Sequence, residues 1–350
     1  MSMTLNGTSG LVFPDSSTQN TAATGFGFKN RIINGAMMID QRNAGASVTP
    51  TDGQYLLDRW QAGLTQASKF SVQQNAGSVT PPTGFTNYLG CTSLSAYSIG
   101  SGDIFSIAQK IEGLNVADLG WGTANASAVT LSFKVYSSLT GTFGGSIRNS
   151  ATTRSYPFSY TISSANTWTT ISVTIAGDTS GTWLTTSGVG IWVSFGLGSG
   201  STYSGTAGAW ATANYTTATG ATSVVGTNGA TFYITGVQLE KGSTATSFDY
   251  RPYGTELQLC QRYFECYYQG ADTNSPLSLY RAAGDYVTYW YYKVEKRSSA
   301  SVAKTSGTTW GGSTPTIYGG SSFSVLTGTS NFYIVGVSAG TLVLTASAEL

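Results

Sequence analysis

Apolar and polar side chains alternate along the middle of the chain, with the two-residue period of a β-strand that buries one face. Residues 129–135, VTLSFKV, place Val, Leu, Phe and Val on one side and Thr, Ser and Lys on the other. The alternation recurs at 171–175, 191–197 and 231–239, and stretches rich in Gly, Ser and Thr separate these runs. Half-buried antiparallel strands joined by such turns are typical of a β-sandwich. We therefore predict a jelly-roll β-sandwich over residues 31–250.

Three further segments complete the predicted organisation. Residues 1–30 are polar and rich in Gly and Thr, which indicates an arm and not a domain. Residues 251–270 carry Pro and Gly at their start and predict a short helical connector. Alternation resumes after it, so residues 271–350 are predicted to form a second β-domain. The predicted fold class is all-β: a jelly-roll-like β-sandwich, a short helix and a second, smaller β-sandwich domain.

Several apolar runs are predicted as individual strands. Two lie near the start of the sandwich, RIINGAMMIDQR at 31–42 and YLLDRWQAG at 55–63. YVTYWYYKVEK at 286–296 has apolar side chains on both faces, which indicates an interface as well as a core. Residues 331–350 are predicted to form a terminal hairpin that turns near Gly340.

The predicted connector helix presents an apolar stripe. Thr255 can cap its start, with Glu256 in the first turn. The members of the stripe recur at three- and four-residue spacing and so share one helix face: Leu257, Cys260, Phe264 and Tyr267. Two interpretations stay open. If three copies assemble, the stripe packs around the threefold axis as an oligomer neck; otherwise the helix caps one end of the sandwich.

Composition excludes several classes of function. Only 9% of residues are charged and the net charge is +1 with no basic block, so nucleic acid is not an expected partner. The absence of histidine removes the commonest general base and the Ser-His and Cys-His pairs of nucleophilic enzymes. The three cysteines suggest no disulfide framework. No signal peptide or long apolar run is visible, so membrane insertion is not expected.

Two patterns could carry catalysis. GVSAG at 336–340 fits G-x-S-x-G with Ser338, but that motif needs a histidine and a following helix, so a turn is the better interpretation. A glycosidase needs two carboxylates about 5 to 10 Å apart. Six acidic residues crowd the first third of the sandwich: Asp40, Asp52, Asp58, Asp103, Glu112 and Asp118. We interpret Asp58 as an ion pair with Arg59, place Asp178 in a turn, and expect neither catalysis nor a cofactor. A structural calcium ion remains an alternative use of these carboxylates.

Three aromatic residues lie outside the core pattern. Trp192 is out of phase with the apolar positions of its strand, while Tyr203 and Trp210 lie in a Gly/Ser/Thr-rich loop. Aromatic planes stack on the apolar face of a sugar, and nearby Asn, Ser and Thr side chains bond its hydroxyls. The three residues are therefore candidates for sugar binding. The alternative is that their rings pack against a neighbouring subunit.

Five segments of the chain stand out as a set: NRIINGAMMIDQR, YLLDRWQ, IAQKIEGLN, VTLSFKVYSSLTGTF and FYITGVQLEKGSTATSFDYRPYGTELQLCQRYFECY. Together they resemble segments of tail-fibre and receptor-binding structural proteins of tailed bacteriophages. The resemblance covers most of residues 30–268 and is strongest from Val237 to Tyr268. GLVFPDSSTQNTAA, near the N-terminus, also resembles a segment of phage structural proteins, especially those of marine and cyanobacterial phages.

The resemblance implies a virion protein with a carbohydrate-binding-module-like jelly roll, usually a homotrimer. We expect residues 1–30 to bind other virion proteins and the β-domains to recognise a host-surface glycan without catalysis. The expected location is the virion, after assembly in the host cytoplasm. Two alternatives stay open: a purely structural virion protein, such as a capsid fibre or tail collar component, and a polysaccharide depolymerase.

Overall fold

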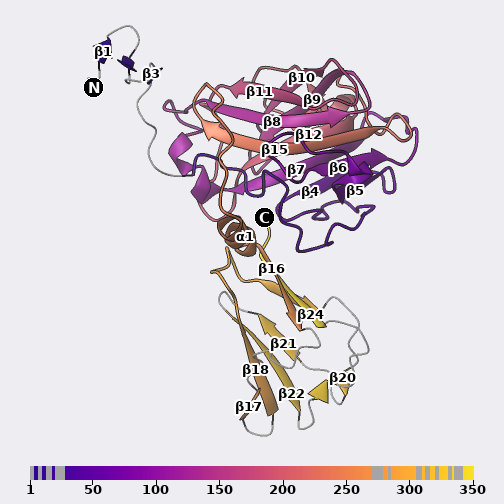
Figure 1. Cartoon of the computed structure of the whole chain (residues 1–350), viewed down its shortest axis with the longest axis vertical. Coiled ribbons are helices and arrows are strands. Elements are labelled where there is room, and N and C mark those ends of the chain that lie inside the picture. Colours follow the sequence, from indigo (N-terminus) through magenta and orange to yellow (C-terminus); the bar gives the residue numbers. More distant parts are fainter. Residues whose placement is uncertain are drawn as a thin grey trace.

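A computed structural model describes residues 28–266, 292–301 and 345–350 in full, and gives only strand bounds elsewhere. Figure 1 shows a large β-sandwich built by the first part of the chain, with helix α1 (Tyr253–Gln261) at its lower edge. Below α1 the chain continues into a smaller group of strands. The predicted all-β fold class is confirmed.

Two antiparallel five-stranded sheets form the sandwich, in the orders β10-β9-β12-β7-β4 and β11-β8-β15-β6-β5. The first sheet contains β4 (Gln61–Leu64), β7 (Ile104–Glu112), β9 (Gly141–Arg148), β10 (Ser155–Ile162) and β12 (Val189–Ser199). The second contains β5 (Phe70–Gln74), β6 (Leu89–Ser93), β8 (Val129–Ser137), β11 (Thr169–Ile175) and β15 (Thr231–Lys241). Neighbouring strands are often far apart in sequence, as a jelly roll requires.

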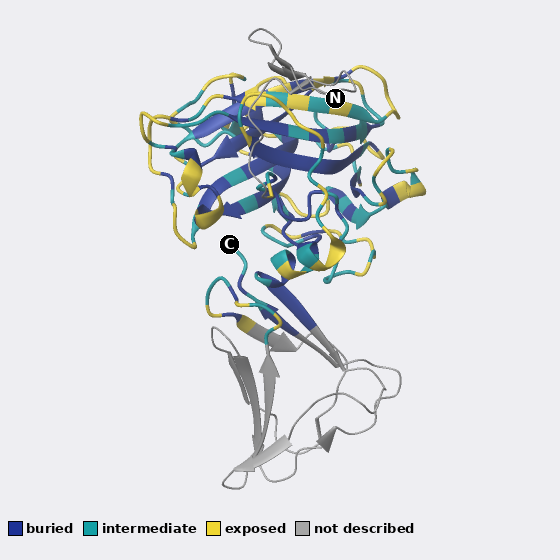
Figure 2. Ribbon diagram, turned by 60° about the vertical axis from the view of Figure 1, so that its left-hand side comes forward, coloured by how far each residue is buried: buried dark blue, intermediate teal, exposed yellow. Residues whose placement is uncertain are grey.

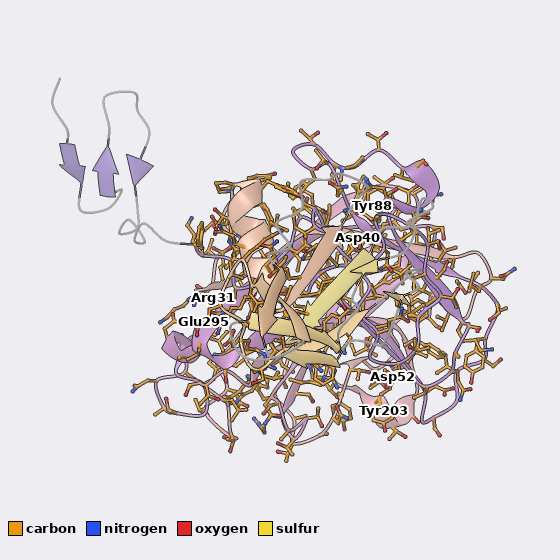
Figure 3. The ribbon with its side chains drawn as sticks, turned by 90° about the horizontal axis from the view of Figure 1, so that it is seen from below. Arg31, Asp40, Asp52, Tyr88, Tyr203 and Glu295 are labelled. Atoms are coloured by element: carbon orange, nitrogen blue, oxygen red, sulfur yellow. The ribbon has the colours of Figure 1, made fainter. Side chains whose placement is uncertain are left out.

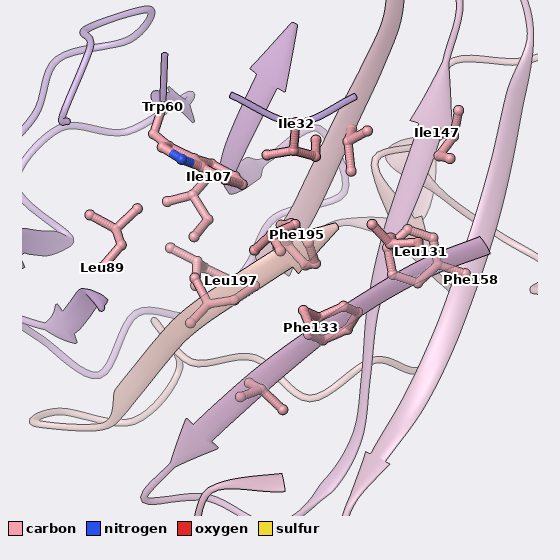
Figure 4. Close-up of a cluster of buried hydrophobic side chains, with 14 of the residues drawn as sticks. Ile32, Trp60, Leu89, Ile107, Leu131, Phe133, Ile147, Phe158, Phe195 and Leu197 are labelled. Carbon is pink, nitrogen blue, oxygen red and sulfur yellow. The ribbon is translucent and has the colours of Figure 1, made fainter. Parts of the chain in front are cut away.

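The apolar positions of the alternating segments fill the space between the sheets. Leu131 and Phe133 of β8 are buried, and so are Phe195 and Leu197 of β12. The rings of Phe133 and Phe195 meet edge to face, with centroids 5.0 Å apart. Figure 4 shows these side chains in one cluster with Trp60. The predicted inward faces of β8 and β12 are therefore confirmed.

Strand β15 departs from simple alternation. Its first apolar positions point into the core as predicted, but Val237 and Leu239 are buried in the same core. The register with β8 shifts between Thr235 and Gln238, and Gly236 within this bulge has φ 61°. An extra residue in the bulge reverses the inward phase of everything after it. Unbroken alternation over residues 231–239 predicts that Val237 lies on the face opposite Phe232 and Ile234, and this prediction is wrong.

Residues 31–42, predicted as a strand, form turns and irregular backbone. Asn34 and Met37 both have φ 57°, the left-handed conformation that interrupts a strand. The backbone N–H and carbonyl of Ile33 bond to the Gln109 side chain and not to the backbone of a neighbouring strand. The Gln109 amide accepts from the Ile33 N–H at 2.9 Å and donates to the Ile33 carbonyl at 2.8 Å. In the second run predicted as a strand, only the last residues belong to β4.

The string that most resembles phage proteins forms a polar clamp around the segment that leads into the sandwich. The Asn30 side-chain amide donates to the Val237 carbonyl at 3.0 Å. Arg251 donates to the Ile32 carbonyl at 3.1 Å and pairs with Glu256 of α1, also at 3.1 Å. Buried charges need such partners, because an unpaired one is costly to desolvate. These residues therefore stabilise the junction of sandwich and helix.

Helix α1 is shorter than predicted. It ends at Gln261, and Phe264 and Tyr267 lie on strand β16 (Phe264–Gln269). The four-residue stripe on one helix face therefore does not form. Aromatic residues favour strands, and pairing of β16 with β24 (Leu342–Ser347) overrides the local helical spacing.

The members of the predicted stripe have different surroundings. Cys260 is fully buried and packs, with the half-buried Leu257, in a small cluster around Ile39 of the same chain. Phe264 is buried, and the Arg42 guanidinium carbon lies 3.6 Å from its ring centroid. The side chain of Tyr267 lies outside the described residues. An oligomer neck at α1 stays a prediction.

Further strands lie toward the two ends of the chain. After β16, the chain contains β17 (Leu279–Ala282), β18 (Asp285–Tyr291), β19 (Ser301–Lys304), β20 (Trp310–Gly311), β21 (Thr316–Gly319), β22 (Phe323–Thr329), β23 (Tyr333–Ile334) and β24. The arm contains β1 (Thr4–Asn6), β2 (Gly10–Val12) and β3 (Thr18–Gln19). The predicted terminal hairpin is wrong, because β24 pairs with β16 and β19 while β23 pairs with β20. Gly340 and Ser338, and the side chains of residues 1–27, lie outside the described residues.

The last residues of the chain return to the sandwich. Glu349 pairs with Arg42 at 2.6 Å and also with Arg59. The Leu350 carbonyl oxygen accepts from the Tyr55 hydroxyl and from Lys110 Nζ, both at 3.0 Å. Figure 2 shows the buried residues concentrated in the sandwich strands and in the first part of β16. No helix within the described residues has the length and apolar character needed to cross a bilayer.

Candidate functional site

A cleft of about 350 Å³ opens on the outer face of the β10-β9-β12-β7-β4 sheet. This volume falls within the range of small-molecule sites. The cleft is walled on one side by the turn before β4 and on the other by the loop between β13 (Ser204–Gly205) and β14 (Thr217–Ala218). The residues that matter most to its chemistry are Asp52, Gln61, Lys110, Arg148, Trp192 and Asn214.

Small side chains leave the space above the sheet open. Gly63 of β4 pairs in register with Ser106 of β7, and both line the cleft. In the next row, Ala108 of β7 pairs with Ser194 of β12. These positions alternate with core residues, so strand pleating directs them outward. The small outward residues of these strands therefore account for the open space of the cleft.

Trp192 stands in a row of three side chains across the sheet. It pairs in register with Lys110 of β7 on one side and with Arg148 of β9 on the other. Lys110 Nζ lies 4.6 Å from the Trp192 ring centroid, and the Arg148 guanidinium carbon lies 4.3 Å from it. Trp192 faces away from the core as its phase predicts. The cations from the two flanking strands cover its ring, so it presents its edge to the cleft and not a free stacking plane.

Arg148 is a buried cation without a carboxylate partner among the described residues. It is 4% exposed, and it donates to Asn214 Oδ1 at 2.8 Å and to Ser194 Oγ at 3.1 Å. Burial lowers the pKa of its guanidinium to about 10. The Arg148 Nε and Trp192 Nε1 atoms are buried and have no acceptor in the described part of the chain. Hydrogen-bond donors therefore exceed acceptors around Trp192.

The remaining charges of the cleft lie beside this row. Burial, and then the nearby Arg59, lower the pKa of Lys110. Asp52 is the single carboxylate among the described residues that line the cleft, and its Oδ1 accepts from the Leu64 N–H at 2.9 Å. Gln61 donates to the Gly53 carbonyl at 2.7 Å, which holds the turn that carries Asp52. Two cations and one carboxylate give the cleft a positive balance.

Tyr203 lies near the cleft but does not line it. It ends the short 3-10 helix η4 (Ser201–Tyr203) and is half-buried, and its carbonyl accepts from the Thr216 N–H at 2.8 Å. Thr216 itself is a lining residue. In the view of Figure 3, Tyr203 and Asp52 lie on the same side of the molecule.

Trp210 lies in a different environment from Trp192. Its ring packs edge to face on Trp121 and Trp183, with both centroid distances 5.4 Å. Its indole N–H donates to the Ala176 carbonyl at 2.8 Å. The structure therefore does not gather the three aromatic candidates into one site. Trp192 is the candidate among them that lines the cleft.

Asp58 does not pair with Arg59 as predicted. It accepts from the Gln41 N–H and from Gln41 Nε2, both at 2.7 Å, while Arg59 pairs with Glu349. Arg59 has φ 71°, so the two consecutive side chains diverge. Burial raises the pKa of Asp58 to about 6, although Arg42 and the bonds from Gln41 oppose the rise.

The other acidic residues singled out from the sequence bind parts of the fold to one another. Glu112 pairs with Arg262 at 2.8 Å, Asp118 with Arg31 at 2.8 Å and Asp178 with Arg154 at 2.7 Å. Asp103 accepts from the hydroxyls of Thr65 and Tyr97, and Asp40 accepts from three N–H groups of the turn that follows it. No group of three His, Cys, Asp or Glu side chains within the described residues could hold a metal ion. The alternative of a calcium ion stays a prediction, as does the absence of catalysis.

Sequence reasoning missed Lys110, Arg148 and Asn214. A signal was present, because Lys110 and Arg148 occupy the outward phase of strands whose neighbours point into the core. In a chain with 9% charged residues, two outward cations on strands that flank β12 in one sheet are informative. Their proximity could not be seen, because 38 residues separate them in sequence and strand order is decided by tertiary pairing.

No protein-family model matches the chain, and no curated protein does so either. Solved structures are similar at low identity. One is the enzymatically active domain of tailspike protein 4 of bacteriophage CBA120, with 13% identity, TM-score 0.32 and coverage of 61% of this chain and 21% of that one. The match therefore spans about a fifth of the tailspike chain.

Two carbohydrate-binding modules are also similar. A family 4 module shares 13% identity, with TM-score 0.31 and coverage of 60% of this chain and 98% of the module. The family 11 module of Clostridium thermocellum, solved with a β-1,3-1,4-mixed-linked tetrasaccharide, shares 11% identity, with TM-score 0.30 and coverage of 57% and 98%. These likenesses concern the fold alone.

Proposed function

We propose that this protein is a glycan-binding subunit of a bacteriophage tail fibre or receptor-binding appendage, and that the cleft beside Trp192 holds the sugar. The observation that carries the proposal is the cleft itself. It has a volume of about 350 Å³ and a floor of small residues, and its walls carry amide, hydroxyl and charged groups. Sites that orient a polar ligand combine such a concavity with a few fixed polar groups.

The walls of the cleft are held in place by the fold. Gln61 is bonded to the Gly53 carbonyl of the turn before β4, Asp52 to the Leu64 N–H at the end of β4, and Asn214 to Arg148. A site whose polar groups are fixed before binding loses less conformational entropy on binding. The cleft therefore suits recognition of a flexible, hydroxyl-rich chain.

The assignment to a phage appendage is supported by the sequence resemblance of residues 237–268 to tail-fibre proteins. In the structure this string connects the last strand of the sandwich, α1 and β16. We propose that the protein assembles as a homotrimer, that residues 1–30 attach it to other virion proteins, and that it works on the virion.

We propose binding without catalysis. Hydrolysis of a glycosidic bond needs two carboxyl groups that flank the bond. Asp52 is the single carboxylate among the described lining residues. Incubation with host exopolysaccharide should therefore release no new reducing ends. Release of reducing ends at an enzymatic rate would favour a depolymerase instead.

Replacement of Trp192 tests the binding site. Trp192→Ala should weaken binding of host-surface polysaccharide at least about tenfold, because the indole ring positions both Lys110 and Arg148. Isothermal titration with polysaccharide fragments and adsorption of the protein to host cells measure the effect. Thr65→Trp, at an exposed lining position, should block the cleft; it loses the hydrogen bond from Thr65 to Asp103 but keeps Trp192, Lys110 and Arg148.

Trp168→Ala is the matched control. Trp168 packs on Tyr88 and Tyr136 at the other sheet, away from the cleft, so this variant should bind as the wild type does. Equal loss of binding in the Trp168 and Trp192 variants would contradict the assignment of the cleft. Absence of glycan binding by the wild type would favour a purely structural virion protein.

A further inference from the structure

The charge of the cleft narrows the class of sugar. This inference rests on the proposed function, because it concerns the ligand of the same site. We propose that the cleft binds an acidic glycan, with the carboxylate of a sugar acid placed between Arg148 and Lys110 at the edge of Trp192. A neutral sugar would leave Arg148 without a carboxylate partner among the described residues.

The arginines of this protein show how unusual Arg148 is. Six of the arginines in the described residues form ion pairs with carboxylates: Arg31, Arg42, Arg59, Arg154, Arg251 and Arg262. Arg148, at 4% exposed, is buried nearly as deeply as Arg59, the most buried of them at 1%, but bonds only to the neutral groups of Asn214 and Ser194. A buried charge without a counter-charge is costly. Its position on the wall of a cleft provides a place from which an anion can enter.

Lys110 adds a second positive charge on the other side of Trp192. It lines the same cleft, and its described bond is to the Leu350 carbonyl oxygen, so two of its three donors remain for a ligand. Carboxylates accept such charge-assisted hydrogen bonds strongly. Lys110, Trp192 and Arg148 therefore stand in one row, which places two fixed positive charges beside the small residues of the cleft floor.

Asp52 sets the orientation of the ligand. It lies on the turn at the β4 side of the cleft, whereas Arg148 belongs to β9, on the far side of β12 and β7 in the sheet. A sugar acid that contacts Arg148 with its carboxylate leaves its hydroxyls toward Asp52 and Gln61, which accept and donate hydrogen bonds. Like-charge repulsion disfavours the opposite orientation.

A glycan array that carries neutral and carboxylated glycans tests the inference on the full chain. We expect carboxylated glycans to be bound, and the best of them to bind at least about tenfold more tightly than its own derivative with the carboxyl groups reduced to alcohols. Increased salt should weaken the carboxylated ligand more than the reduced one. Preferential binding of neutral glycans would overturn this inference and leave the proposed function standing. Binding of no glycan would overturn both.

Two substitutions assign the preference to the cleft. Lys110→Met and Arg148→Met should each reduce the ratio of affinities for the carboxylated and reduced ligands toward one. Lys134→Met is the matched control, because Lys134 is an outward lysine of the other sheet that bonds to Thr170, and it should keep the ratio. Lys110 is only partly buried, so its variant should remain folded even if the Arg148 variant does not. An unchanged ratio in folded Lys110→Met would overturn the placement of the carboxylate.

Discussion

At the scale of single residues, the phase of a side chain within its strand largely decides its role. Trp192 is the clearest case, because its position between core residues directs it outward. Phase alone does not reveal the partners of a side chain. Asp58 bonds to Gln41 and not to its neighbour Arg59, because the left-handed backbone at Arg59 separates consecutive side chains.

The buried carboxyl of Asp58 should make stability depend on pH. Its pKa is about 6 in the folded chain against an ordinary value of 3.8, so the unfolded chain loses this proton first as pH rises. Wild-type stability relative to Asp58→Asn should therefore be highest below pH 4, fall between pH 4 and 6, and stay level above. At about 1.4 kcal/mol per pKa unit the fall is up to about 3 kcal/mol.

Urea unfolding of both proteins at pH 4, 5, 6 and 7 measures this difference. Groups other than Asp58 contribute equally to the two proteins and cancel. A difference in unfolding free energy that is the same at all four pH values would show that Asp58 titrates normally.

At the scale of elements, the alternation of apolar and polar residues predicted the core strands well. The prediction was wrong where a bulge or a left-handed residue changes which face the following side chains point to. The bulge at Gly236 moves Val237 into the core, and left-handed residues divide 31–42 into turns. The predicted length of the connector helix was wrong for another reason. Helical spacing continues past Gln261, but β24 supplies a strand partner for the next residues, and pairing with it satisfies their backbone groups.

Gly236→Ala should destabilise the sandwich more than Gly229→Ala does. Both glycines have positive φ, 61° and 73°, so both variants bear the cost of a left-handed alanine, about 1 kcal/mol. An added Cβ at Gly236 would lie 2.7 Å from the Phe85 ring, whereas at Gly229 it would meet nothing within 4 Å. We expect Gly236→Ala to cost at least about 1 kcal/mol more.

Thermal or urea unfolding of the two glycine variants measures this comparison. Gly229→Ala is the control for backbone strain without a clash. Equal losses of unfolding free energy would mean that the Phe85 ring moves aside freely.

At the scale of the whole molecule, residues 349–350 bind to loops that precede β4. Glu349 approaches two arginines of the early loops, and Arg59 among them is 1% exposed. Arg297 donates to the carbonyls of residues 348 and 349, both at 2.9 Å. Glu349 and the two arginines, Arg42 and Arg59, therefore form one buried ionic cluster beside β7.

Glu349→Gln should destabilise the fold by about 3 kcal/mol, because it leaves the buried Arg59 without a counter-charge. Asp118→Asn is the control, since the Asp118 side chain is 48% exposed and its pair with Arg31 should contribute less than about 1 kcal/mol. Urea unfolding at pH 7 measures both. Similar losses for the two variants would show that the end of the chain is not docked in solution as it is here.

The sequence by itself determined the all-β class, the inward faces of β8 and β12, and the outward phase of Trp192, because these depend on side chains one or two residues apart. Tertiary structure decided where α1 ends, which partners the buried charges have, and that Lys110, Trp192 and Arg148 stand in one row. Those features depend on the order and register of strands from distant parts of the chain. Local periodicity carries no information about which strand becomes the neighbour of which.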